Sequence, residues 1–356
     1  MTEAIEILKK DAISLLKELI AVPSFSKEEW QTASILSRFL AQKKVATTRV
    51  GNNVFCTNLY FNASRKTILL NSHHDTVQPN SAYTKDPFKP VIEDSKLYGL
   101  GSNDAGGALV SMTASFLYFY NHTDLKYNIA LALTGEEEIS GANGIESILS
   151  YLPAIDCAIV GEPTGMQLAV AERGLLVLEC KASGKAGHAA RNEGENAIYK
   201  ALKDIQWFQE FSFYKISALL GPINMSVTVI ETENKAHNVV PAECRFVVDV
   251  RLNEMYEADE VLNVIRKNIL SDVVARSTRL RSTIIPLDHP LVQAGIALGK
   301  NHYGSPTTSD KALMPFPALK IGPGDSVRSH IADEFIYLNE IKEGIETYIQ
   351  LLKRLL

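Results

Sequence analysis

A chain of 356 residues is longer than a single hydrophobic core usually supports, so two domains are expected. Its composition, 46% hydrophobic and 22% charged, is that of an ordinary globular protein, and a formal charge of -5 argues against a nucleic-acid-binding surface. The expected partner is therefore a small molecule and not a nucleic acid.

The first residues of the chain and the spacing of its cysteines indicate the cellular compartment. The first residues lack the basic-then-apolar order of a signal peptide, and no apolar run reaches the roughly 18 residues of a membrane span. We therefore expect a cytoplasmic protein without a membrane partner. Cys56, Cys157, Cys180 and Cys244 are scattered without a Cys-x-x-Cys pair, which predicts buried free thiols.

The first half of the chain alternates between helical and strand-like segments. Apolar residues at helical spacing predict helices over residues 3–20 and about 28–41. Strands are predicted over 54–60 and 66–71, and the second is a nearly continuous apolar run that suits a buried strand.

The alternation continues toward residue 160. A start of small residues leads into an apolar helix over 105–120, with Asp104 at the expected N-cap, and strands are predicted over 128–134 and 157–160. Alternating strands and helices predict an α/β domain with a mostly parallel sheet that is covered on both faces.

From about residue 175 the pattern changes. Segments of strand, helix, strand, strand, helix and strand are predicted over 175–182, 195–210, 225–231, 244–252, 257–270 and 278–285. This order matches a split, ferredoxin-like sheet. After Pro286 the chain returns to the first domain with a helix over 291–298, a strand over 318–321 and a helix over 339–356. The first domain is therefore predicted to be discontinuous.

Five short acidic or histidine clusters punctuate the chain, and most of them directly follow a predicted strand. They are His73-His74-Asp75, Asp104, Glu136-Glu137-Glu138, Glu162 and His330. In an open α/β sheet, the loops at the carboxyl ends of the strands converge on one crevice. The clusters supply oxygen and imidazole ligands with one carboxylate to spare, which indicates a hydrolytic centre with two metal ions.

Each cluster alone also has an ordinary structural explanation. A His-x-Asp step lets His73 bind a metal while Asp75 fixes its tautomer, but such pairs are common in polar loops, and His74 is given no role. Asp104 would equally serve as a helix cap. Three adjacent glutamates usually form a solvated charge run. Because these three follow a buried strand, we expect one to bind metal and another to act as general base.

The remaining single residues are weak indications by themselves. Glu162 precedes a proline and is typical of a turn, and a lone His330 is commonly a surface or core residue. The Gly99-x-Gly101 pair resembles the start of a dinucleotide-binding motif, but Asp104 stands in place of the third glycine. NAD binding is therefore discarded, and the set of clusters carries the hypothesis.

Five segments in chain order are more specific together than singly. They are Ser72-His73-His74-Asp75-Thr76-Val77, residues 99–107, Thr134-Gly135-Glu136-Glu137-Glu138, Gly161-Glu162-Pro163-Thr164 and Gly187-His188. Over essentially the whole chain they resemble the dizinc aminoacylase and carboxypeptidase family of acetylornithine deacetylase and succinyl-diaminopimelate desuccinylase. The resemblance implies a zinc-exopeptidase-like catalytic domain, residues 1–171 and 285–356, and an inserted ferredoxin-like α+β dimerisation or lid domain, residues 172–284.

The resemblance also implies two Zn²⁺ per chain, although Co²⁺ or Mn²⁺ accept the same ligands. His73 and Glu162 would bind one ion, Glu138 and His330 would bind the other, and Asp104 would bridge both.

Further roles follow for residues around the metal ions. Asp75 would orient His73, and Glu137 would be the general base. His188 would reach the site of the neighbouring subunit and help to hold the oxyanion, which makes the protein a homodimer. Asn238 and Arg251 would contact the substrate, although a surface arginine on an alternating strand explains Arg251 nearly as well.

The implied activity is hydrolysis of the amide bond of an N-acyl amino acid. The first choice is N-acetyl-ornithine or a related N-acyl ornithine or citrulline of arginine biosynthesis. Alternatives are succinyl-diaminopimelate desuccinylation, a metallo-dipeptidase or aminopeptidase, and a catalytically silent relative that the presence of Glu137 disfavours. Thr308-Ser309-Asp310 resembles a desuccinylase segment, but Lys311-Ala312 stand where that subgroup tends to have Gly and Arg, and Glu136 replaces a common aspartate.

Overall fold

The computed structural model describes residues 2–356 and divides the chain into two compact units. The first unit runs to Val170 and resumes over Ile285–Tyr303 and Ser309–Leu356, and the second comprises Ala171–Ile284 and Gly304–Thr308. The short segment Gly304–Thr308, which the sequence assigns to the first domain, thus belongs to the second unit. The reason is its hydrogen bonding, because the Arg173 N–H donates to the Ser305 carbonyl and the Thr308 hydroxyl donates to the Arg173 carbonyl.

The first unit is built on a mixed sheet whose strand order is β1-β2-β6-β3-β7-β17-β8. The central strands β6, β3, β7 and β17 are parallel, and β2 and β8 pair antiparallel at either side. Every residue of β3 and β6 is buried, as their apolar runs predict. The bounds are β1 (Thr48–Val50), β2 (Asn53–Thr57), β3 (Thr67–His73), β6 (Asn128–Thr134), β7 (Cys157–Val160), β8 (Leu168–Glu172) and β17 (Ala318–Lys320).

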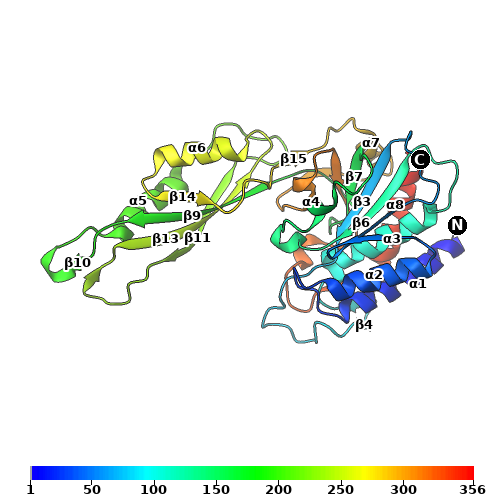
Figure 1. The fold of residues 1–356 in the computed structure, drawn as a ribbon, viewed down its shortest axis with the longest axis horizontal. Helices are drawn as coiled ribbons and strands as arrows, with labels where there is room; N and C mark the ends of the chain where they lie inside the picture. Colours follow the sequence, from blue (N-terminus) through cyan, green and yellow to red (C-terminus); the bar gives the residue numbers. More distant parts are fainter. Residues whose placement is uncertain (1) are drawn as a thin grey trace. The chain divides into compact units, whose positions relative to one another are not determined.

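Helices cover both faces of this sheet (Figure 1). On one face α3 packs against β3 and β6, and α1 and α8 pack against α3. On the other face the buried side chains of α4 pack with Leu69, Ala130 and Ala158. The bounds are α1 (Thr2–Ile20), α2 (Trp30–Gln42), α3 (Gly107–Phe119), α4 (Ile145–Ile148), α7 (Pro290–Ile296) and α8 (Leu338–Lys353).

The parallel pairing brings the chemistry-bearing loops to one edge. His73 at the end of β3 is in register with Thr134 at the end of β6, and Val160 at the end of β7 is in register with Lys320. A smaller antiparallel sheet of β4 (Val91–Glu93), β5 (Lys96–Tyr98) and β18 (Phe335–Tyr337) joins two further segments. Because β5 precedes Asp104 in the chain and β18 follows His330, their pairing brings together the segments that carry these two residues.

The second unit has the β-α-β-β-α-β order, with sheet order β11-β13-β9-β14. The predicted last strand over 278–285 is wrong, because the edge strand β14 is formed earlier and only the two residues of β15 are extended within that range. Four residues complete the pairing of β14 with β9, and so short a strand leaves no readable alternation. The bounds are β9 (Gly174–Ser183), α5 (Ala197–Glu210), β11 (Asn224–Glu231), β13 (Glu243–Leu252), α6 (Ala258–Asn268), β14 (Asp272–Ala275) and β15 (Thr283–Ile284).

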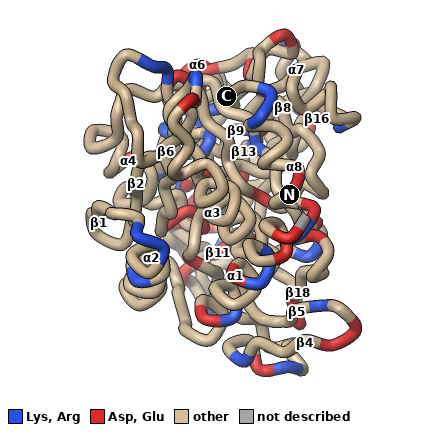
Figure 2. Tube along the Cα trace, turned by 90° about the vertical axis from the view of Figure 1, so that its right-hand side faces the viewer, with Lys and Arg blue, Asp and Glu red and all other residues tan. Residues whose placement is uncertain are grey.

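Surface and core properties complete the description. Lys and Arg residues are interspersed with Asp and Glu residues along the trace (Figure 2). The four cysteines are buried and free, as predicted. Among residues 2–356, none of the helices is both long enough and apolar enough to cross a membrane.

Candidate metal centre

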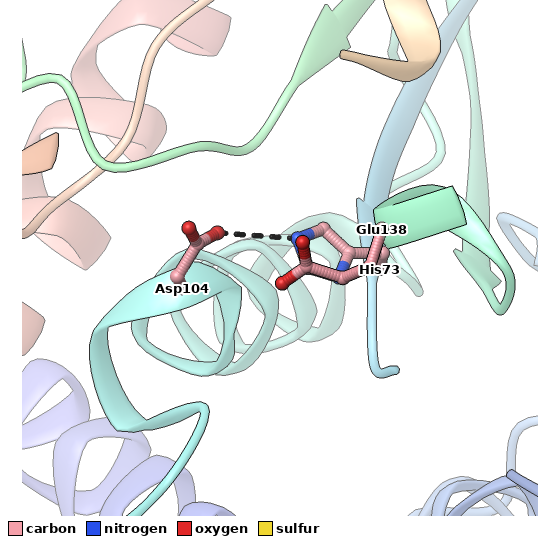
Figure 3. A group of neighbouring side chains, drawn as sticks. All are labelled: His73, Asp104 and Glu138. Carbon is pink, nitrogen blue, oxygen red and sulfur yellow. Dashed lines mark hydrogen bonds and ion pairs between the residues drawn. The ribbon is translucent and has the colours of Figure 1, made fainter. Parts of the chain in front are cut away.

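His73 ends the buried strand β3, and its ring is 1% exposed. The Nδ1 atom lies 3.0 Å from the backbone oxygen of Asp75, which can only accept a hydrogen bond, so Nδ1 carries the proton. The lone pair of Nε2 is therefore free to bind a metal. This atom lies 3.3 Å from Asp104 Oδ1, a contact drawn as a dashed line in Figure 3, and 3.8 Å from Glu162 Oε1.

Asp104 lies in the irregular turn η1 (Ser102–Gly106) and is not the helix cap that the sequence suggests. Helix α3 begins later, at Gly107, and no side chain caps it. Glycines allow the turn to close tightly, since a Cβ atom at Gly106 would lie 2.3 Å from the carbonyl oxygen of Gly101. The turn leaves the carboxylate of Asp104 directed at the end of β3 rather than at a helix N-terminus.

The three adjacent glutamates take three different positions. Glu136 has a left-handed backbone (φ 58°), and its carboxylate accepts a hydrogen bond from the Asn143 side chain at 2.9 Å. The backbone N–H groups of Glu137 and Glu138 donate to the carboxylate of Asp75 at 3.0 and 3.1 Å. Of the three, Glu137 and Glu138 are directed at the cluster formed by His73, Asp104, Glu162 and His330. Their side chains are 12% and 8% exposed.

His330 approaches the cluster from the other end of the chain. Its Nε2 atom lies 3.0 Å from Glu138 Oε2 and 3.8 Å from Asp104 Oδ2. Its backbone is left-handed (φ 61°), a conformation that is uncommon for residues other than glycine and that often marks functional sites. The ring is 54% exposed, so this side of the cluster is open.

The donor atoms form two overlapping groups. In each of the sets His73-Asp104-Glu138 and His73-Glu137-Glu162, one ligand atom per residue lies within 4.8 Å of the others. Figure 3 shows the first of these sets. Two atoms bound to one four-coordinate ion at about 2.0–2.2 Å lie roughly 3.3–3.6 Å apart. The distances of 3.0–3.8 Å between the histidine nitrogens and their carboxylate neighbours straddle that range. The residues therefore fit a pair of cations.

The charges of the cluster suit cations as well. Burial, reinforced by the negative charge of Asp104, raises the pKa of Glu162 to about 8. Burial also raises the pKa of Glu137 well above its ordinary range. The hydrogen bond to Glu138 raises the pKa of His330 to about 9. Several carboxylates thus crowd around two imidazoles, and divalent cations would relieve their repulsion.

The remaining predicted site residues lie in the second unit. β10 (Gly187–His188) pairs with β12 (Val239–Val240), and the Ala189 N–H donates to the Asn238 carbonyl, so His188 and Asn238 are neighbours. His188 Nδ1 accepts a hydrogen bond from the Ala190 N–H, which leaves the ring proton on Nε2. Arg251 forms a two-point ion pair with Asp249. Their contributions to catalysis remain predictions.

Two buried carboxylates near the cluster are missing from the predicted set. Asp310 accepts a hydrogen bond from the Thr134 hydroxyl at 2.9 Å, and Glu334 accepts from the N–H of Asp104 at 2.9 Å. For Asp310 the resemblance of Thr308-Ser309-Asp310 to a desuccinylase segment was the available indication. Glu334 lies in an ordinary polar stretch, and its sequence gives no indication of burial.

Known proteins resemble this chain over most of its length. Residues 69–354 match the peptidase family M20/M25/M40. Succinyl-diaminopimelate desuccinylase 2 of Ruegeria sp. (strain TM1040) is 27% identical over 309 residues, which cover 82% of this chain and 73% of the relative. Succinyl-diaminopimelate desuccinylases of Dinoroseobacter shibae and Pelagibacter ubique are 28% and 29% identical and cover 75% and 72% of this chain.

Solved structures share the fold. The M20 family metallo-carboxypeptidase Sso-CP2 from Sulfolobus solfataricus superposes with a TM-score of 0.78 at 18% identity, covering 96% of this chain and 98% of its own. The YXEP protein of Bacillus subtilis, described as a dinuclear metal binding peptidase from the M20 family, gives 0.73 at 14% identity, with 98% of each chain covered. These matches confirm the fold class and the enzyme class, a metal-dependent amidohydrolase, that the sequence predicts. The chain belongs to peptidase family M20/M25/M40.

Proposed function

We propose that this protein binds two divalent cations in the cluster and hydrolyses the amide bond of an N-acyl amino acid. The observation that carries the proposal is the convergence of five ligand side chains beside an additional buried carboxylate, that of Glu137. The ligands are His73, Asp104, Glu138, Glu162 and His330. The dinuclear centre of the Bacillus subtilis neighbour supports two ions rather than one.

The ligands divide between two ions according to their neighbours. His73 Nε2 and Glu162 Oε1 are 3.8 Å apart and would hold one ion, and Glu138 Oε2 and His330 Nε2 are 3.0 Å apart and would hold the other. Asp104 presents one oxygen to each histidine and would bridge both. Zinc is the first metal to test, because nitrogen and carboxylate ligands of this kind are typical of zinc hydrolases, with Co²⁺ or Mn²⁺ as alternatives.

The reaction follows from the positions of the chain's own groups. Bound cations would supply Lewis acidity toward water and the amide carbonyl. Glu137 takes a proton from the attacking water and passes it to the nitrogen of the leaving amine. A carboxyl group in this position can hold the proton between the two steps. Attack of the water on the amide carbon leaves a negative charge on the former carbonyl oxygen. His188 of a neighbouring subunit, with its proton on Nε2, would donate a hydrogen bond to this oxyanion.

The relatives favour succinyl as the acyl group of the substrate. The relatives described above act, by their names, on succinyl-diaminopimelate, so they support the second choice of the sequence analysis better than N-acetyl-ornithine. An N-succinyl diamino acid is therefore the first substrate class to test.

N-acyl ornithine stays the second candidate, because the chain departs from the desuccinylase segment at Lys311. Lys311 stands where the desuccinylase segment tends to have glycine, and its side chain is 1% exposed. Its Nζ atom donates to the Val170 carbonyl at 3.2 Å, so the residue takes part in the core and not in an open substrate pocket.

A substrate panel tests the proposal. Purified protein loaded with Zn²⁺ or Co²⁺ would be assayed with succinyl-diaminopimelate, N-succinyl-ornithine, N-acetyl-ornithine, N-acetyl-citrulline and dipeptides. We expect the highest kcat/KM for an N-succinyl substrate. Turnover of dipeptides alone would reject the deacylase in favour of a peptidase, and turnover of acetyl substrates alone would reject succinyl specificity.

The proposal includes a homodimer formed by the second unit. Its edge strand β11 exposes Val229 and Ile230 by 46% and 51%, and helix α5 exposes Tyr199 by 67%. Exposed apolar side chains on an edge strand and a neighbouring helix are typical of surfaces that pair with another chain. Light scattering on the purified protein should give twice the mass of the chain, and a fully active monomer would contradict the role given to His188.

A further inference from the structure

Glu334 is a buried carboxylate whose partners are all backbone N–H groups of one turn. Its side chain accepts from Gly101 at 2.9 Å, from Asn103 at 2.8 Å and from Asp104 at 2.9 Å. The residue is 2% exposed. A buried carboxylate is costly unless its oxygens are satisfied, and here one side chain satisfies three donors of the turn that carries Asp104.

The segment around Glu334 is bonded to the same turn at a second point. The side chain of Asn103 accepts from the Asp325 N–H and donates to the Asp325 carbonyl, both at 3.0 Å. The backbone oxygen of Glu334 also accepts from the Gly99 N–H at 3.0 Å. Residues 325–334 include His330, so hydrogen bonds on both sides of His330 connect its segment to the Asp104 turn.

The position of Asp104 makes this connection functionally relevant. Its Oδ1 atom lies 3.3 Å from His73 Nε2, and its Oδ2 atom lies 3.8 Å from His330 Nε2. A carboxylate that bridges two ions must present both oxygens within about 0.5 Å of the productive geometry. No regular helix fixes the backbone at Asp104, whose φ and ψ are -115° and 102°. The hydrogen bonds of Glu334 supply the missing constraint.

We propose that Glu334 is a positioning residue of the metal centre: it fixes the Asp104 turn so that the two carboxylate oxygens of Asp104 face His73 and His330. Glu334 acts through Asp104 and contacts neither the substrate nor the cations. The inference rests on the proposed dinuclear centre.

The test is the substitution Glu334→Gln, which keeps the shape but turns an amide N–H₂ toward backbone donors. Zn²⁺ affinity and stoichiometry would be measured by chelator competition, and the ligand geometry by the absorption spectrum of the Co²⁺ form. Loss of a group that orients a ligand typically costs about 10–100-fold in metal affinity or activity. We expect a weakening of this size for at least one ion, an altered Co²⁺ spectrum, and a lower kcat with a nearly unchanged KM.

The second unit offers a matched control. Asp204 is 4% exposed, and its carboxylate accepts from the backbone N–H groups of Leu270 and Ser271 at 3.1 and 2.8 Å. Asp204→Asn removes the same kind of buried backbone anchor without touching the Asp104 turn. This variant should lose thermal stability but keep the wild-type Zn²⁺ affinities and Co²⁺ spectrum.

The outcomes separate this inference from the proposed function. Wild-type protein that binds no metal would reject the dinuclear centre itself. Two ions in the wild type, with equal affinities and spectra in Glu334→Gln, would reject only the role of Glu334. If Glu334→Gln does not fold, Glu334→Asp, which keeps the charge but withdraws it by one methylene, is measured with the same expectations. Failure of both variants to fold would overturn the positioning role in favour of a purely structural one.

Discussion

Asp75 holds the backbone of Glu137: its Oδ1 atom accepts the Glu137 N–H at 3.0 Å, while Oδ2 accepts the Glu138 N–H at 3.1 Å. The Ser26 hydroxyl donates to Oδ2 at 2.7 Å. The backbone oxygen of Asp75 is also the partner of His73 Nδ1. One fully buried residue therefore connects a proposed ligand with the proposed base, which extends the orienting role that the sequence suggests for Asp75.

Asp75→Asn should impair catalysis although it keeps the shape of the side chain. The single amide oxygen can satisfy only one of the two N–H groups, and the amide N–H₂ would face the other donor. We expect kcat to fall about 10–100-fold, as for other residues that orient metal ligands. Ser26→Ala removes one donor but neither anchor and should change kcat less than tenfold. Equal kcat values for Asp75→Asn and the wild type would show that the turn holds its geometry without the anchor.

Glu137→Gln should separate chemistry from metal binding. The amide cannot take a proton from water, so kcat should fall by about 10²–10⁴-fold, the contribution typical of a general base. Metal content, measured by atomic emission, should stay near two ions per chain. Glu136→Gln is the matched control, because its carboxylate is directed at Asn143 and not at the cluster. Wild-type turnover by Glu137→Gln would refute its assignment as the base.

Removing the metal should lower both activity and stability. Ions that bind only the folded state stabilise it by mass action, so dialysis against a chelator should lower the Tm, and added Zn²⁺ should restore it. In His330→Ala we expect one ion to remain tightly bound, because His73 and Glu162 are unchanged. A Tm that does not respond to chelator, or two tightly bound ions in His330→Ala, would contradict the proposed division of ligands.

The strands that carry the site could be predicted because their sequences are nearly continuous apolar runs that stop at charged residues. The predicted strand over 128–134 coincides with β6, and that over 157–160 coincides with β7. Parallel order then requires the residues after each strand to share an edge. The sequence alone therefore groups His73, Glu137, Glu138 and Glu162.

Other parts depend on tertiary contacts that leave no local pattern. Glu334 follows Asp333, and both resemble solvated loop residues in the sequence, yet the pairing of β18 with β5 buries Glu334 against the Asp104 turn. The sequence predicts the start of α3 two residues too early, because Asp104 resembles a helix cap. In both cases the local preference is overridden by contacts that the site requires.

The stability of the metal-free protein should depend on Asp310 through pH. Burial raises the pKa of Asp310 from 3.8 to about 6 in the folded protein. Because the folded value is the higher one, its contribution to stability is complete below about pH 3.8 and is lost as the pH rises through about 6. As the pH rises from about 3.8 to about 6, the free energy of unfolding of the wild type should therefore fall, relative to that of Asp310→Asn, by an amount on the order of 2–3 kcal/mol. Urea unfolding with chelator, repeated across pH, measures the difference, and a constant difference would contradict the shift.

Arg328→Lys should destabilise the segment that presents His330. The Arg328 guanidinium forms a two-point ion pair with Glu340, donates to the Phe335 carbonyl at 3.3 Å and lies 5.6 Å from the ring of Tyr337. It is 8% exposed, so little solvent replaces these contacts. Lysine keeps the charge but not the planar fork, and we expect a loss of about 1–2 kcal/mol in the free energy of unfolding.

The matching exposed pair, Arg245 with Glu243, provides the comparison for Arg328. The side chain of Arg245 is 55% exposed, and ion pairs of this kind contribute little to stability because water competes for both charges. The urea concentration at the midpoint of unfolding should therefore be the same for Arg245→Lys and the wild type. Because Arg328 lies two residues before His330, only Arg328→Lys should also weaken binding of the ion that we propose Glu138 and His330 to hold. Equal unfolding midpoints for the two variants would mean that the fork of Arg328 does not anchor this segment.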